Sequence, residues 1–279
     1  MNFTRWHERY CIDSKLKYPS IRTQENYQCS VGTFLKHFND VPDPKHITTQ
    51  QIKEWLLTFS TINTRNHKLC AVKSFYQITV GMPLKLEKIP FSKKEKKLPI
   101  ILSVSEIQKM FTVCENVKHK VILSLLYSCG LRVSELINLK WQHIDRNRMI
   151  INVIQAKGNK DRQVPLDGVL IPLLEDYYRK YKPSVYVLNG QFTNQYSATS
   201  VGQVVKQLSA KAGICNKRVW THLIRHCHAS HLVEQGTDIN IVQRILGHSS
   251  PKTTSIYLHL SHNLISSVPT PLSNIALYP

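Results

Sequence analysis

Six side chains in the second part of this sequence are suited to chemistry on a phosphodiester. They comprise two guanidinium groups, an amine, two imidazoles and a phenol: Arg132, Lys157, His222, Arg225, His248 and Tyr257. A guanidinium is planar, permanently charged and able to hold phosphate through two parallel hydrogen bonds. Two of them can stabilise the charge of a phosphorane-like transition state in place of magnesium. The set is therefore suited to phosphodiester chemistry without a metal.

His222 and Arg225 form a His-x-x-Arg pair, which places both side chains on one face of a helix. The first turn of that helix, where free amides and the helix dipole favour an anion, would hold His222. His226 follows His222 at the spacing of a helical zinc pair, but no cysteine or carboxylate cluster offers a third ligand. We therefore expect no metal. The extra histidines of this helix, His226, His228 and His231, are interpreted as packed or exposed side chains.

Tyr257 follows the start signals of a short helix. Ser250 suits the N-cap and Pro251 the first helical position. Gly247 ends the preceding helix and would present His248 to the same pocket as Tyr257. A phenol has a reference pKa of about 10, so it needs a base or cationic surroundings to attack at neutral pH. Without the other motifs, a tyrosine on an amphipathic helix would be read as a core residue.

Charge and length indicate a two-domain protein with a nucleic-acid partner. A chain of 279 residues is long for one core and favours two domains. Its 37 basic and 18 acidic residues give a net charge of +19. Residues 1–98 hold 17 basic and 8 acidic side chains, and residues 99–279 hold 20 and 10. Basic surface on both parts suits DNA between or within them, whereas the alternative is a basic surface that only confers solubility.

The cysteines and the N-terminus favour a cytoplasmic location. Seven cysteines, an odd number, fall mostly in apolar stretches and form no Cys-x-x-Cys pair, which is typical of reduced, buried thiols. The first residues have no apolar signal core, and no later run is long enough to span a membrane. We expect the protein to stay in the cytoplasm with its DNA and to have no membrane partner.

Hydrophobic periodicity predicts a small helical bundle at the N-terminus, followed by a linker. Three amphipathic stripes with helical spacing fall at residues 27–38, 52–59 and 69–76. The periodicity fails between about Lys85 and Leu98. A run of lysines lies there between Pro90 and Pro99, which predicts an extended linker over residues 89–98. The lysines could cross DNA phosphates, and they are Lys93, Lys94, Lys96 and Lys97.

The remaining chain predicts a mixed domain that is mainly helical. Ser103 to Glu106 reads as a capping box, the apolar run 121–127 as a central buried helix, and Gly130 as the left-handed end of that helix. Residues 149–153 and 163–166 predict a short antiparallel hairpin around a turn at 158–159. Further helices are expected at about 168–182, 200–212, 222–235 and 238–246. The predicted fold class is mainly α with a small antiparallel β-hairpin or sheet.

In this order and context, the motifs resemble the active site of tyrosine recombinases, the phage-integrase and Xer-type family. The segments that carry the resemblance are Tyr127–Leu136, Ala156–Arg162, His222–Arg225 and Leu246–Tyr257. The resemblance implies that Tyr257 attacks the scissile phosphate, leaving a 3′-phosphotyrosine and a free 5′-hydroxyl. It also implies that Lys157 protonates the leaving oxygen and that Glu135 braces Arg132. The family commonly has glycine before this lysine, where the present sequence has Ala156.

The resemblance extends to organisation and partners. It implies a helical core-binding domain that clamps DNA (1–88), a basic linker (89–98) and a mixed α+β catalytic domain (99–279) with a C-terminal tail from about residue 263. The expected enzyme is a site-specific recombinase or integrase that acts on double-stranded DNA with a specific core site. It would be a monomer in solution and a homo-tetramer on two sites, work through a Holliday junction, and need neither metal nor ATP. Besides the linker lysines, Lys160 and Arg162 are expected to bind DNA.

Two other functions fit parts of the sequence. A type IB topoisomerase uses a similar catalytic set, and it would relax supercoiled DNA as a monomer without a specific site. A DNA-binding protein with an inactive site would form no covalent adduct with DNA. The helical core-binding part and the compact length argue against the first alternative. The complete set of six residues argues against the second.

Overall fold

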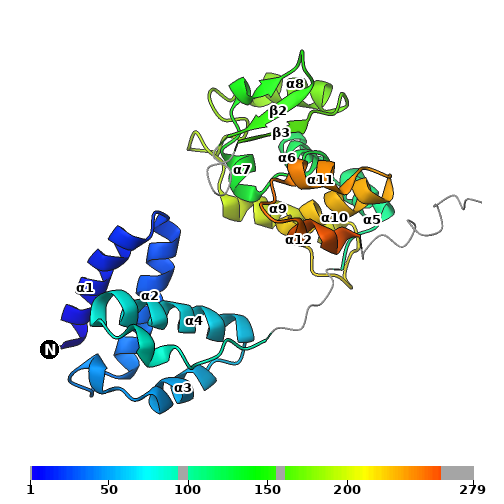
Figure 1. The fold of residues 1–279 in the computed structure, drawn as a ribbon. Coiled ribbons are helices and arrows are strands. Elements are labelled where there is room, and N and C mark those ends of the chain that lie inside the picture. The colour runs from blue at the N-terminus through cyan, green and yellow to red at the C-terminus, as the bar shows by residue number, and fades with distance from the viewer. Residues whose placement is uncertain (1, 94–99, 155–160, 259–279) are drawn as a thin grey trace, which may run out of the picture. The chain divides into compact units, whose positions relative to one another are not determined.

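The computed structural model describes residues 2–93, 100–154 and 161–258, and it confirms the predicted fold class. The chain divides into two compact units, Met1–Lys96 and Lys97–Pro279 (Figure 1). Helices dominate both units, and three short strands in the second form one antiparallel sheet. Within the described residues, no helix has both the length and the apolar character needed to cross a membrane.

The first unit is a helical bundle built on an aromatic core. Its elements are α1 (Asn2–Lys17), α2 (Ile21–His37), η1 (Pro44–His46), α3 (Thr49–Leu57), α4 (Ile62–Phe75), the π turn η2 (Tyr76–Val80) and η3 (Pro83–Leu86). The three predicted stripes belong to α2, α3 and the α4–η2 segment. The ring of Phe34 lies 5.1 Å from that of Trp55 and 6.3 Å from that of Phe75, both edge-on. These aromatic pairs join the three helices in one core.

The linker begins later than the sequence indicated. Ile89 is buried, 5% exposed, in the core of the first unit. Asn66 exchanges two hydrogen bonds of 3.0 Å with the backbone of Ser92, and Lys73 Nζ donates to the Ile89 carbonyl at 3.0 Å. Residues 89–92 therefore belong to the packed first unit, because these contacts replace the solvation expected of a linker. Residues 94–99 lie outside the described part of the chain.

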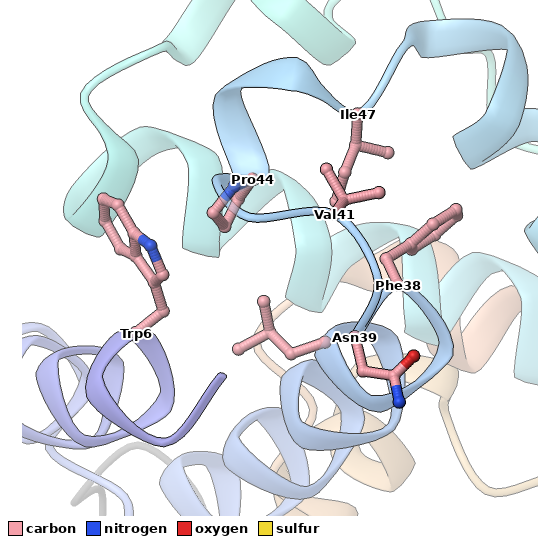
Figure 2. Close-up of a pocket in the computed structure, with 7 residues that line it drawn as sticks. Trp6, Phe38, Asn39, Val41, Pro44 and Ile47 are labelled. Carbon is pink, nitrogen blue, oxygen red and sulfur yellow. The ribbon is translucent and has the colours of Figure 1, made fainter. Parts of the chain in front are cut away.

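The first unit contains a small hollow between α1, the end of α2 and the segment that follows α2 (Figure 2). It is lined by Trp6, Leu35, Phe38, Asn39, Val41, Pro44 and Ile47. Its volume is about 10 Å³, which is about the room that a single water molecule needs. A substrate does not fit there, so this hollow is a packing feature of the bundle.

The second unit surrounds one buried helix. Its helical elements are α5 (Val104–Thr112), α6 (Val117–Ser128), α7 (Val133–Ile137), η4 (Trp141–His143), α8 (Leu170–Tyr181), α9 (Ala198–Lys211), α10 (Thr221–Glu234), α11 (Ile239–Leu246), α12 (Pro251–Thr254) and η5 (Ser255–Tyr257). The predicted central helix is α6, where residues 121–126 are all buried. It packs against α7, α8, α9 and α10, so the surrounding helices share its apolar surface.

The sheet contains the predicted hairpin and one additional strand. Its order is β1 (Ile144–Asp145), β2 (Ile150–Val153) and β3 (Arg162–Pro165), all antiparallel. Ile151 pairs with Val164 across β2 and β3, and both side chains are buried. The alternating burial of β2 is typical of a sheet with one face on the core. The hairpin tip, residues 155–160, lies outside the described residues.

Two glycines end the helices that lead into the candidate site. Gly130 follows α6 with φ +57°, and Gly247 caps α11 with φ +61°; the left-handed position of Gly130 and the helix end at Gly247 were predicted. A Cβ on Gly130 would lie 2.4 Å from Cδ2 of His228. Only glycine therefore fits this turn without a shift, and the turn leads directly to Arg132.

Candidate active site

Arg225 is the buried centre of the candidate site. This α10 side chain is 1% exposed. Its Nη1 donates to the Gly130 carbonyl at 2.5 Å, and its Nη2 donates to the Leu246 carbonyl. These acceptors lie at the ends of α6 and α11, so one guanidinium joins both helix ends. Burial, followed by the nearby charge of Arg132, lowers the pKa of Arg225 to about 9, and the group stays charged at neutral pH.

A single carboxylate orients the neighbouring arginines. Glu135 lies on α7 with a side chain that is 4% exposed. It accepts the backbone N–H of Arg132 at 2.7 Å and Nη1 of that side chain at 2.6 Å. It also accepts two 2.7 Å hydrogen bonds from Arg162. Burial alone would raise the pKa of Glu135, but the hydrogen bonds and charges of Arg162 and Arg132 lower it to about 2. The carboxylate therefore stays ionised and fixes the planes of both guanidinium groups.

The structure shows contacts of Arg162 within the protein, and the expectation that it binds DNA stays a prediction. Its side chain is 7% exposed, and Nε donates to the Ile245 carbonyl at 2.6 Å. Because both terminal nitrogens donate to Glu135, each of its three nitrogens already has a protein acceptor. Arg162 ties the first residue of β3 to α7 and to the end of α11. It therefore anchors the start of β3, the strand that follows residues 155–160 in the chain.

Tyr257 lies in this arginine cluster, at the end of η5. The residue is 2% exposed. Burial raises the pKa of its phenol to about 12, while the charges of Arg225 and Arg132 act in the opposite direction. The phenol is therefore protonated at neutral pH, and attack by this group would require removal of its proton. The rings of Tyr257 and His248 are stacked, with centroids 6.5 Å apart and an interplanar angle of 12°.

The hydroxyl of Tyr257 meets a histidine that the sequence analysis interpreted as a packing residue. Nδ1 of His226 lies 2.9 Å from Tyr257 Oη. The ring of His226 also meets that of His222 edge-on, with centroids 4.8 Å apart. The available signal was the i, i+4 spacing of the two histidines, which placed His226 on the same helix face as His222. The same spacing also fits a zinc pair, so it does not by itself identify the partner of His226.

The two predicted histidines lie in the same cluster and are uncharged at neutral pH. His222 is exposed at the surface, but partial desolvation of its ring lowers its pKa, and Arg225 and Arg132 lower it further. The same causes, in the same order, lower the pKa of His248 to about 4. Nδ1 of His248 lies 3.0 Å from Thr254 Oγ1, which connects it to α12. The positive charge of the described site thus comes from its arginines, and an anion would find neutral imidazoles beside them.

The structure brings five of the six predicted residues together. The sixth, Lys157, lies outside the described residues, as do four of the predicted DNA contacts: Lys94, Lys96, Lys97 and Lys160. Lys93 is described and exposed, at the end of the first unit. Over residues 2–93, 100–154 and 161–258, no three His, Cys, Asp or Glu side chains are placed to hold a metal ion. The catalytic and DNA-binding roles themselves stay predictions.

We expect Gly247→Ala to destabilise the protein more than Gly213→Ala does. Both glycines have positive φ, +61° and +71°, so alanine costs about 1–2 kcal/mol at either position. At Gly247 the new Cβ would also lie 2.8 Å from Cδ of Arg162, whereas at Gly213 nothing lies within 4 Å. Urea unfolding of both variants measures the difference. Equal losses would mean that Arg162 does not restrict the end of α11.

The comparisons with known proteins all point to one protein family. The model of the phage integrase family matches residues 101–263. A tyrosine recombinase of Pseudothermotoga lettingae is 33% identical over 235 residues, which cover 80% of this chain and 81% of the relative. Tyrosine recombinase XerA of Pyrococcus horikoshii is 36% identical over 201 residues, 71% of this chain and 69% of the relative.

Solved structures share the fold at lower identity. XerH bound to its difH substrate, in a post-cleavage complex, has a TM-score of 0.74 at 19% identity, covering 87% of this chain and 78% of that one. A lambda integrase tetramer bound to a Holliday junction has a TM-score of 0.74 at 17% identity, covering 91% and 76%. At these identities the structural similarity concerns the fold.

Proposed function

The chain belongs to the phage integrase family and is a tyrosine-type site-specific recombinase, and we propose that Tyr257 is the nucleophile with which it cuts and rejoins DNA. One observation carries this proposal: the phenol of Tyr257 is buried, and the positive charges of Arg225 and Arg132 are close enough to lower its pKa. These are the permanently charged groups that a phosphodiester in its transition state would need.

In the proposed step, the phenol oxygen of Tyr257 forms a bond to phosphorus as the bond from phosphorus to the 5′-oxygen breaks. The products are a 3′-phosphotyrosine and a 5′-hydroxyl. A 5′-hydroxyl from the partner strand reverses the step, so the energy of the phosphodiester is conserved. A guanidinium has five N–H donors. The carbonyls of Gly130 and Leu246 use one N–H on each terminal nitrogen of Arg225, and the second N–H of each terminal nitrogen would serve the non-bridging oxygens.

The proposed proton donor to the 5′-oxygen is Lys157. Its position is bracketed by the end of β2 at Val153 and the start of β3 at Arg162. Because Arg162 is fixed to Glu135, the base of the hairpin is held against the arginine cluster. This anchoring supports the role of Lys157, since a general acid must come within hydrogen-bonding reach of the leaving group.

The proposed partner is double-stranded DNA with a specific core site, on which four protomers join two duplexes. The net charge of +19 supports DNA binding. The solved complexes of XerH with difH and of the lambda integrase tetramer with a Holliday junction support the assembly. We propose a monomer in solution that binds DNA through the first unit, the segment of Lys93–Lys97 and the hairpin around Lys160. It would act in the cytoplasm, at the nucleoid.

Removal of residues 263–279 should separate DNA binding from strand exchange. These residues are apolar and interrupted by prolines, and they lie outside the described structure. We propose that they dock on a neighbouring protomer, because burial of apolar surface is favourable, by about 25 cal/mol per Å². Gel shifts of the truncated protein should show single-site binding, whereas cooperative two-site binding and recombination should fall. Full recombination without the tail, or loss of single-site binding, would contradict this proposal.

Covalent capture tests the proposed function and supplies its substrate. Fragmented DNA from the source genome is incubated with the protein, adducts that survive denaturant are isolated, and the attached DNA is sequenced. We expect one recurrent core site, and a plasmid with two copies of it should recombine. Relaxation of supercoiled plasmids that lack the site would instead support a type IB topoisomerase. DNA binding without any adduct would indicate an inactive site.

A further inference from the structure

A hydrogen bond joins the hydroxyl of Tyr257 to the imidazole of His226. Nδ1 of His226 lies 2.9 Å from Tyr257 Oη, and within the described residues His226 is the hydrogen-bond partner of this hydroxyl. Tyr257 is 2% exposed and His226 is partly buried. A general base must lie within about 2.6–3.2 Å of the proton that it removes. His226 meets this condition before any movement of the chain.

A second tyrosine–histidine hydrogen bond in the same unit joins two helices of the core and serves as a control. Tyr127 Oη lies 2.8 Å from Nδ1 of His231, and Nε2 of His231 lies 3.0 Å from the carbonyl of Leu102. A carbonyl only accepts, so Nε2 carries the hydrogen and Nδ1 accepts the hydroxyl of Tyr127. Burial raises the pKa of Tyr127, and the nearby ionisable groups that raise it further are Cys227 and Glu234, with no arginine among them. This pair is structural, and it provides a matched control.

We propose that His226 is the general base of the cleavage step and removes the proton of Tyr257 as the phenol attacks DNA. The proposal rests on the proposed function of Tyr257. As the phenol oxygen bonds to phosphorus, its proton passes to Nδ1 of His226. The electron pair of the breaking bond stays on the 5′-oxygen, which takes a proton from Lys157. In the rejoining step the imidazolium of His226 returns its proton to the phenol, so protons balance over the cycle.

The groups around His226 make its charge responsive to DNA. His222 and Arg225 face it from its own helix, Tyr257 faces it from η5, and His248 lies close enough to interact electrostatically. Without DNA, burial and then His222 and Arg225 lower the pKa of His226 to about 4, so the ring is neutral and able to accept a proton. A phosphodiester held by the arginines brings a negative charge that favours the imidazolium. The base would thus become stronger when the substrate is in place.

The test compares His226→Asn and His226→Ala with the control His231→Asn. The probe is a nicked duplex carrying the captured core site, and the measurement is the single-turnover rate of adduct formation across pH. Asparagine can accept the hydrogen bond of Tyr257 but cannot take its proton. We expect the cleavage rate of His226→Asn to fall by about 100-fold or more with unchanged affinity for the duplex. The rate of His231→Asn should stay within a few-fold of wild type.

Two further readouts separate proton transfer from a structural role. Added imidazole should restore part of the cleavage by His226→Ala and none by the Tyr257→Phe variant. The acidic limb of the wild-type pH–rate profile, where protonated His226 cannot act, should be absent in His226→Asn. Wild-type cleavage by His226→Asn, or faster cleavage, would overturn the proposal, as would folded His226→Ala that imidazole does not rescue. A wild-type protein that binds the duplex and forms no adduct would overturn the function of Tyr257 itself.

Discussion

Tyr257→Phe should abolish covalent capture of DNA and leave DNA affinity unchanged. Phenylalanine preserves the ring that stacks on His248 and removes the oxygen that would bond to phosphorus. Because a covalent intermediate cannot form without its nucleophile, we expect adduct formation to fall below detection on a nicked duplex carrying the core site. Denaturing gels measure the adduct, and gel shifts measure binding.

Tyr127→Phe is the matched control for this experiment. It also removes a hydroxyl bonded to a histidine, at 2.8 Å, so both variants lose a hydrogen bond of about 1 kcal/mol. The control should form the adduct at close to the wild-type rate. If Tyr257→Phe still forms the adduct at the wild-type rate, Tyr257 is not the nucleophile.

The second large effect is expected at the arginines, and Arg132→Ala is its clearest test. Arg132 is 21% exposed, whereas Arg225 is 1% exposed and holds two helix ends together. Substitution of Arg225 would therefore combine a loss of stability with a loss of catalysis. By analogy with the removal of an oxyanion-hole donor, Arg132→Ala should slow cleavage by about 10²–10³-fold, or about 3 kcal/mol. The single-turnover rate on the nicked duplex measures this loss.

A modified substrate distinguishes the role of Arg132 from that of Lys157. Replacement of the 5′-bridging oxygen by sulfur gives a leaving group that needs no general acid. Cleavage of this substrate by Lys157→Ala should recover, because only proton donation has been lost. Arg132→Ala should stay slow on it, because the charge on the non-bridging oxygens is unchanged. Equal recovery of both variants would contradict the separate roles.

The parts of the fold that follow from local signals were predicted from the sequence. The ends of α6 and α11 were predicted from Gly130 and Gly247, and both glycines have left-handed backbone. Helix α12 starts at Pro251 as predicted, with Ser250 at the N-cap position but without a hydrogen bond from its side chain to the helix. Helix α1 was missed because its buried face includes Tyr10 and Ser14 rather than a continuous apolar stripe. Two of its apolar side chains, Ile12 and Leu16, are 62% and 85% exposed, whereas an amphipathic helix is expected to bury its apolar side chains.

The parts of the site that depend on distant contacts were not accessible to spacing arguments. Arg162 reaches Glu135 across 27 residues and Ile245 across 83. In the sequence it is one of several charged residues near a turn, so a DNA contact was the natural interpretation. His226 meets Tyr257 across 31 residues. Spacing identifies neighbours on one helix, but the partner from another element is chosen by tertiary packing.

The central claim, that Tyr257 becomes joined to the 3′-phosphate of DNA, is tested most directly by mass spectrometry of the trapped adduct. The adduct is formed in EDTA, the DNA is trimmed by nuclease, and the protein is cut with trypsin. The last tryptic peptide, residues 253–279, contains both Tyr257 and Tyr278, so fragmentation must locate the nucleotide within it. We predict a 3′-phosphonucleotide on Tyr257. A nucleotide on Tyr278, or an adduct that requires magnesium, would contradict the account.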